Sequence, residues 1–166
     1  MTAKQQYALV KILAAIPDDR RESFREVAEY AISLGYMPAI KGARGTYADF
    51  TNSKFRREIM KIDTDPNFPT RLAVRFHAMP AYSGIFQAAL DERVRILREM
   101  GHEPRCWGCG KCDGTHGYTL TNPGGKQGFL CGSGVLTLPG FGAQNVSEIK
   151  EALKLQDEFF VEHIAK

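Results

Sequence analysis

Four cysteines carry the most distinctive chemistry in this sequence. The stretch RCWGCGKCDGTH contains Cys106, Cys109 and Cys112 at three-residue intervals, and Cys131 follows nineteen residues later. Thiolates bind soft or borderline metal ions, and two cysteines separated by two residues can reach one ion across a tight turn. Four thiolates are the usual complement of a closed structural zinc site. The pattern therefore predicts that Cys106, Cys109, Cys112 and Cys131 bind one Zn²⁺.

Iron is the alternative metal for the same cysteines. The run CWGCGKC resembles the cluster-binding run CxGCGxC of bacterial ferredoxins over these seven residues. The resemblance implies an iron–sulfur cluster that serves a redox protein or enzyme. However, no Cys-Pro follows Cys112, and Cys131 lies beyond an expected hairpin, which is typical of a zinc ribbon. We therefore expect Zn²⁺, with the iron–sulfur cluster as the alternative.

Two neighbours of the cysteines are expected to support the metal without binding it. His116 follows the cysteine run and suits a contact to a ligand. Trp107 lies between two ligands, where its ring either covers the metal loop or projects toward a partner. Four thiolates fill the coordination of a zinc ion, so we predict no catalytic residue there. A catalytic zinc that uses His116 or Asp113 in place of Cys106 remains the alternative.

A second candidate site combines aromatic and basic residues from two segments of the chain. Tyr36, Tyr47 and Tyr82 could line an apolar pocket that has Lys41 or Arg75 at its mouth. Such a pocket would take a small molecule of unknown identity. The alternative is that these aromatic side chains belong to the core between the sheet and the helices.

Other features do not predict an enzyme. His77 and His102 have no carboxylate or nucleophile partner that the sequence identifies, so we expect both to be structural. The chain contains no G-x-S-x-G, P-loop or dinucleotide-binding pattern. We therefore expect a binding or regulatory module whose partner is a small molecule or a protein.

Charge and composition limit the remaining classes of partner. The net charge is +3, and residues 41–75 hold eight basic against four acidic side chains. Nucleic-acid-binding domains are usually more basic, so a zinc-ribbon protein that binds nucleic acid is only a second alternative. The N-terminal apolar run is too short to span a membrane and lacks a cleavage site, which predicts neither an anchor nor a signal peptide. Clustered thiols then indicate a cytoplasmic protein that binds metal.

The first third of the chain should form two helices followed by strands. Leu9, Ile12, Leu13 and Ile16 recur at helical spacing, and Pro17 ends that pattern. A second helix should be capped by Asp18 or Asp19 and end at Gly35. Beyond it, glycines and scattered aromatics predict two strands joined by a turn at KGARG. Residues 54–65 suit either a helix or a strand, and we interpret them as the hairpin partner of the strand RLAVRF.

The remaining two thirds should add a long helix, the cysteine region and a last helix. Residues 81–101 have the strongest helical pattern. The segments GYTLTN, QGFLCG and GVLTLPG read as short strands of one small antiparallel sheet. Asn145 with Glu148 predicts a capping box that starts the C-terminal helix. The order indicates an α+β protein, with residues 1–166 as one domain and a zinc-ribbon-like, metal-binding lobe at about 102–142.

Overall fold

The structure, a computed structural model, describes residues 1–42, 46–105, 116–121 and 127–164. Two helices open the chain, α1 over Ala3–Ala14 and α2 over Asp18–Ser33. The prediction that Asp18 or Asp19 caps α2 is wrong. Pro17 occupies the cap position, and both aspartates lie in the first turn, where they still match the helix dipole. The φ of Pro17, −52°, is already close to the helical value. The helix therefore begins at Asp18, and neither aspartate is at the position from which a side chain could cap it.

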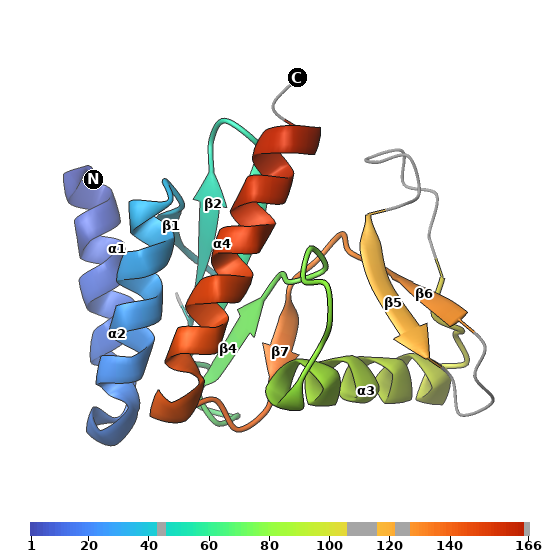
Figure 1. The fold of residues 1–166 in the computed structure, drawn as a ribbon. Coiled ribbons are helices and arrows are strands. Elements are labelled where there is room, and N and C mark those ends of the chain that lie inside the picture. Colours follow the sequence, from blue (N-terminus) through green and yellow to red (C-terminus); the bar gives the residue numbers. More distant parts are fainter. Residues whose placement is uncertain (43–45, 106–115, 122–126, 165–166) are drawn as a thin grey trace.

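Five strands form one antiparallel sheet in the order β1-β2-β3-β4-β7 (Figure 1). Their bounds are Met37–Lys41, Tyr47–Asn52, Arg57–Asp63, Arg71–Val74 and Leu136–Leu138. The ambiguous segment is a strand, and it pairs with β4 as expected. The prediction that the strand at 136–138 belongs to a small sheet with the cysteine hairpin is wrong. It pairs with β4, because Leu136 and Leu138 continue the apolar face of Val74 and Leu72.

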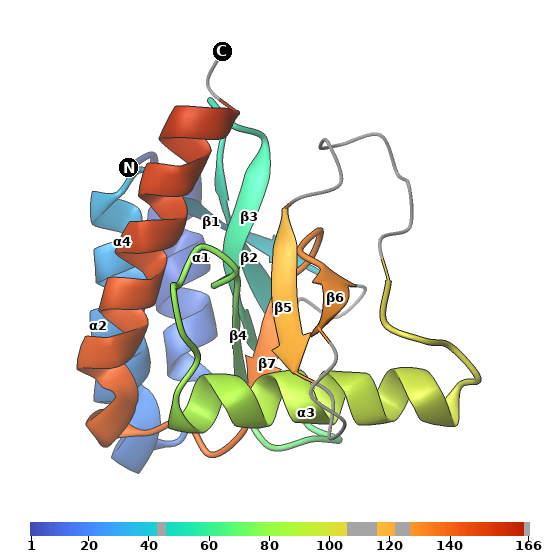
Figure 2. The same cartoon turned by 45° about the vertical axis from the view of Figure 1, so that its right-hand side comes forward.

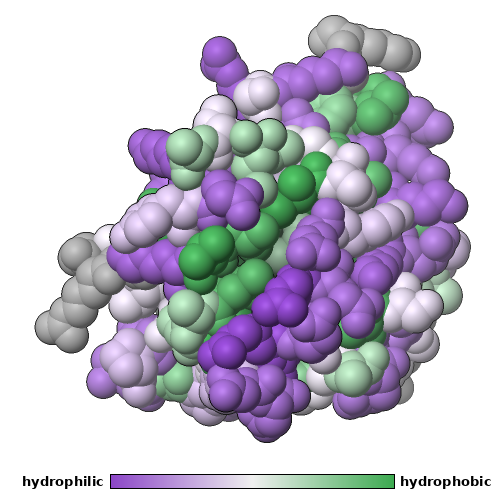
Figure 3. All heavy atoms as spheres, turned by 90° about the vertical axis from the view of Figure 1, so that its left-hand side faces the viewer, coloured by the Kyte–Doolittle hydropathy of each residue, from purple (hydrophilic) through white to green (hydrophobic). Residues whose placement is uncertain are grey.

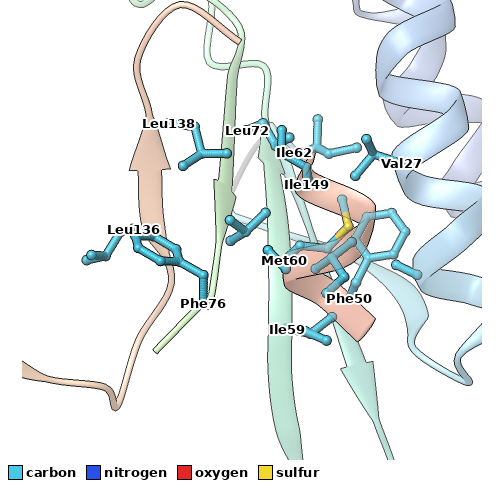
Figure 4. Close-up of a cluster of buried hydrophobic side chains, with 14 of the residues drawn as sticks. Val27, Phe50, Ile59, Met60, Ile62, Leu72, Phe76, Leu136, Leu138 and Ile149 are labelled. Carbon is cyan, nitrogen blue, oxygen red and sulfur yellow. The ribbon is translucent and has the colours of Figure 1, made fainter. Parts of the chain in front are cut away.

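The core lies between one face of this sheet and the helices. Ala48, Phe50 and Ile62 point to that face, while the residues that alternate with them are only half buried. Figure 4 shows Val27 of α2 and Ile149 of the last helix directed toward these strands. Both helical side chains are fully buried. Burial of this helix–sheet interface is therefore the main apolar contribution to the fold.

Two further helices complete the structure. Helix α3, Gly84–Glu99, runs across the foot of the sheet beneath β7, and α4, Val146–His163, crosses its covered face beside α2 (Figures 1 and 2). The predicted capping box of α4 is wrong. Asn145 is the last residue of the 3₁₀ turn Ala143–Asn145 and has φ −98° and ψ −10°, and its side chain accepts from the Gly142 N–H instead. Glu148 pairs with the hydroxyl of Ser83.

The hairpin next to the cysteine run forms a second, two-stranded sheet. Strands β5, Gly117–Thr121, and β6, Gln127–Cys131, stand above α3 (Figure 2). Tyr118, Leu120 and Leu130 are buried and belong to the same hydrophobic core as the main sheet. The α+β class is thus confirmed. The metal-binding character of the lobe stays a prediction, because residues 106–115 lie outside the described part of the chain.

An apolar strip crosses the α1 side of the molecule (Figure 3). Large apolar side chains exposed on α1 include Tyr7 and Val10. Next to them, a groove of about 530 Å³ between α1 and the edge strand β1 is lined in part by Ala8, Pro38 and Ile40. Among the helices that the structure describes, none combines the length and apolar character needed to cross a bilayer.

Candidate functional site

A buried arginine joins three segments where β4 leaves the sheet. Arg75 is 5% exposed, and its backbone N–H donates to the Ile59 carbonyl at 2.8 Å, which extends the β3–β4 ladder. Its Nε donates to the Glu58 carbonyl at 3.1 Å, and its Nη1 and Nη2 donate to the Gly132 and Ser133 carbonyls. One side chain therefore ties the main sheet to the end of the cysteine hairpin.

A cavity of about 200 Å³ lies beside Arg75. Its wall combines residues from the loop before β3, from the end of β4, from the β5–β6 hairpin and from α4. The lining residues with polar or reactive side chains include Arg56, Arg57, His77, His116 and Cys131. The cavity is the point at which the cysteine hairpin meets the basic and imidazole groups of the rest of the chain.

A glycine sets how closely the hairpin approaches His77. A Cβ at Gly132 would lie 2.6 Å from His77 Cδ2 and 3.0 Å from the His116 carbonyl oxygen. The Gly132 N–H donates to that same carbonyl at 3.0 Å. Because real Cβ atoms are not found so close to other heavy atoms, only glycine fits here without displacement of the ring. Residues after Cys131 are thereby held against the His77 ring.

Three histidines gather around Phe159 beside this cavity. The Phe159 ring centroid lies 4.9 Å from His77, 4.8 Å from His116 and 4.2 Å from His163. The rings of His77 and His116 are nearly parallel, with centroids 6.3 Å apart. Residues far apart in the sequence thus form one aromatic and imidazole cluster beside the cavity that Cys131 lines.

The protonation state of His77 follows from its neighbours. Gln156 accepts from the Ala78 N–H through Oε1, so its amide nitrogen is the group that faces His77 Nε2 at 3.2 Å. An amide nitrogen only donates, so His77 Nε2 accepts and its proton lies on Nδ1. Burial, followed by the charge of Arg75, lowers the pKa of His77 to about 3. The ring is therefore neutral at physiological pH.

Glu58 is the acidic residue that lines the cavity, and its carboxyl group, like the His77 ring, is shifted toward its neutral form. Burial, followed by the negative charge of Asp49, raises its pKa from 4.5 to about 7. The Lys61 ammonium lies 3.7 Å from Asp49 and 4.0 Å from Glu58, which favours the ionised forms but does not offset the burial. Near neutral pH, Glu58 is thus partly protonated.

This raised pKa predicts how a Glu58→Gln variant depends on pH. The folded protein holds the Glu58 proton to a higher pH than the unfolded chain, so wild-type stability falls as pH rises from about 4.5 to about 7. We expect the variant to be more stable than wild type by about 1–2 kcal/mol at pH 8 and equal to it near pH 4.5, allowing for partial solvent exposure. Urea unfolding at both pH values measures this. A stability difference between Glu58→Gln and wild type that is the same at both pH values, or a variant that is more stable only at the lower pH, would contradict this expectation.

The structure describes only part of the predicted metal site. Cys131 is a free, partly exposed thiol at the end of β6, and His116 immediately precedes β5. Cys106, Cys109, Cys112 and Trp107 lie outside the described residues. Within the described residues, no group of three or more His, Cys, Asp or Glu side chains is arranged to hold a metal ion.

The residues of the predicted aromatic pocket are separated in the structure. Tyr36 is fully buried and its hydroxyl donates to Asp157 at 2.9 Å. Tyr82 packs against Phe76, with ring centroids 5.5 Å apart. The others lie elsewhere, with Lys41 exposed at the end of β1, Tyr47 opposite it on β2 and Arg75 in the cavity described above. Of the five residues, only Arg75 lines the cavity beside Cys131.

Sequence reasoning missed Glu58, Gln156 and the position of His77 at this site. His77 and Cys131 are far apart in the chain, and no motif links them. In the strand RLAVRF, Leu72, Val74 and Phe76 alternate with Arg71, Ala73 and Arg75. The pattern therefore assigned Arg75 to the polar face and gave no indication that its side chain is buried.

Three residues of the central basic segment are paired or buried. Lys61 lies within ion-pair distance of Asp49 and Glu58, Arg71 lies 2.7 Å from Asp63, and Arg75 is buried. These contacts leave less of the local +4 charge available to phosphates. The expectation that nucleic-acid binding is weak or absent stays a prediction.

A comparison of the chain with protein-family models, with curated proteins and with solved structures finds no match in any of the three. The functional interpretation accordingly rests on the residues of this chain.

Proposed function

We propose that this chain is a cytoplasmic metal-binding protein in which Cys106, Cys109, Cys112 and Cys131 hold one structural Zn²⁺. The zinc fixes the β5–β6 hairpin against the main sheet, and the resulting surface binds a small molecule or a protein. The proposal assigns no catalytic step to the metal, because four thiolates complete a tetrahedral site.

The register of the hairpin supports this proposal most directly. Cys131 pairs with Gly117, the first residue of β5, and Gly117 lies five residues after Cys112 in the sequence. A fully extended chain advances about 3.3–3.6 Å per residue, so the tether from Gly117 to Cys112 is short. In zinc ribbons, a hairpin carries one part of the ligand set close to the segment that carries the rest.

A second consideration is that the hairpin needs support. An isolated two-stranded hairpin is marginally stable in water. Tyr118, Leu120 and Leu130 anchor this hairpin to the core, but they lie on one face of it. A metal bound at the end that carries Cys131 would contribute folding energy to the hairpin.

Elemental analysis of untagged protein tests the proposal. We expect about one zinc per chain and negligible iron. A brown preparation that contains iron and acid-labile sulfide in stoichiometric amounts would replace zinc by the iron–sulfur alternative on the same cysteines. Protein that contains neither metal, and does not take up zinc on titration, would refute both.

A further inference from the structure

We propose that the cavity beside Arg75 binds a small oxyanion, a ligand whose carboxylate or phosphate group accepts hydrogen bonds from that guanidinium. This site goes beyond the proposed zinc function. Its arginines lie outside the cysteine lobe, because Arg57 begins β3, Arg56 directly precedes that strand and Arg75 directly follows β4. Gly132 and Ser133 at the end of the hairpin complete the site. Four observations on the described residues carry it.

First, the charge of Arg75 has no full counter-charge nearby. Within the described residues, no carboxylate lies at ion-pair distance from its guanidinium, which is bonded only to neutral carbonyls. Burial raises the pKa of both Tyr36 and Tyr118 beside it, so neither ionises. Burial and Asp49 also keep Glu58 partly protonated. A buried cation without a partner is unfavourable, and an anion in the cavity would remove that penalty.

Second, Arg75 retains donors that the protein does not use. A guanidinium has five N–H groups, and three of them donate to the Glu58, Gly132 and Ser133 carbonyls. Two N–H groups, one on each terminal nitrogen, therefore have no acceptor among the described residues. The three carbonyl bonds fix the guanidinium in place, so these donors are already oriented before a ligand binds.

Third, the cavity wall is basic. Its arginines are Arg56, Arg57 and Arg75, and Glu58 is its only carboxyl group among the described residues. Arg56 is exposed and adds positive charge at the rim, which attracts anions from solution. Phe160 also lines the cavity, and its ring centroid lies 5.6 Å from the Arg75 guanidinium carbon.

Fourth, the size of the cavity restricts the ligand. Its volume of about 200 Å³ lies below the range of roughly 300–1,000 Å³ that holds drug-sized molecules. Inorganic phosphate or a carboxylate of a few carbon atoms fits this volume. A nucleotide does not.

Titration of the ¹⁵N-labelled full-length protein tests the proposal at constant ionic strength set by chloride. Inorganic phosphate is the probe in one arm and malonate in the other, which separates a phosphate ligand from a carboxylate ligand. We expect saturable shifts of the Arg75 Nε–H and of the Gly132 and Ser133 amide signals in at least one arm. Their location tests the site in the wild-type protein, without any substitution.

Variants at two exposed positions test the electrostatics. Ser133→Asp places a negative charge at the exposed cavity wall, and we expect at least about a 10-fold loss of affinity. The asparagine of Ser133→Asn has the shape of aspartate without its charge, so the affinity of this variant for the anion should stay within about threefold of wild type. Arg56→Gly should weaken binding about threefold yet remain folded, because Arg56 has a φ of 53° that suits glycine. Lys11→Gln on α1 removes one charge at an exposed position outside the cavity wall and should change nothing.

The outcomes decide between two roles for Arg75. Saturable shifts at Arg75 that weaken with Ser133→Asp but not with Ser133→Asn support the oxyanion site. Absence of saturable shifts in both arms, shifts confined to other parts of the protein, or equal affinity of the two Ser133 variants would overturn it. Arg75 would then serve only to join the main sheet to the end of the hairpin.

Discussion

Replacement of Arg75 by alanine is expected to lower the free energy of unfolding by about 2–4 kcal/mol. The side chain donates to the carbonyls of Glu58, Gly132 and Ser133, and the Gly132 carbonyl is buried with it. Alanine would leave these acceptors without a partner, and each buried unsatisfied group costs about 1–3 kcal/mol. The contact of the guanidinium with the Phe160 ring would be lost as well.

Urea unfolding measures this loss, and Arg71→Ala is its matched control. Arg71 lies at the start of the same strand and pairs with Asp63, but its side chain is 36% exposed. Exposed ion pairs contribute about 1 kcal/mol or less, so the control should lose no more than that. If the two alanine variants were equally stable, Arg75 would not be the tie between the sheet and the hairpin.

The second large effect is expected from Cys131→Ser. If Cys131 is a zinc ligand, the variant should lose the metal and the folding energy that the metal supplies to the hairpin. Amide exchange at residues 117–121 and 127–131 should accelerate by at least about 100-fold, corresponding to about 2.7 kcal/mol of local stability. Helices α1, α2 and α4 should keep wild-type protection, because they pack against one another and against strands β1–β3 of the main sheet.

The matched control for this prediction is Ser133→Ala. Ser133 is two residues after Cys131, lines the same cavity and contributes its carbonyl rather than its side chain to Arg75. Its substitution should leave metal content and hairpin protection unchanged. Wild-type exchange rates in Cys131→Ser, with metal retained, would remove Cys131 from the ligand set.

Much of the fold was predictable because it depends on local periodicity. The helical spacing from Leu9 to Ile16 gave α1, and the period-two alternation of RLAVRF gave β4. Both capping predictions were wrong for local reasons. Pro17 occupies the cap position of α2, so neither aspartate can cap that helix. Asn145 ends a 3₁₀ turn and has helical dihedral angles, so it does not form a capping box with Glu148. The pairing of β7 with β4 is a long-range choice made by apolar burial, which local patterns do not encode.

The candidate site also has a part that local patterns predict and a part that they do not. The spacing of the cysteines predicted a metal site on the hairpin, because ligand spacing is a local property of the sequence. The cavity was not predictable, because Arg75, His77 and Phe160 line it together with Cys131 only after the sheet, the hairpin and α4 have assembled. Tyr36 and Tyr82 looked like pocket residues from their segments, yet burial assigns them to packing against Asp157 and Phe76.

X-ray absorption spectroscopy at the zinc edge tests the central claim most directly. The account predicts one zinc per chain, surrounded by four sulfur atoms at about 2.3 Å, with no nitrogen or oxygen ligand. Zinc bound by fewer sulfur atoms together with nitrogen or oxygen would contradict the closed four-cysteine site. The absence of zinc, with an iron signal in its place, would contradict the choice of metal.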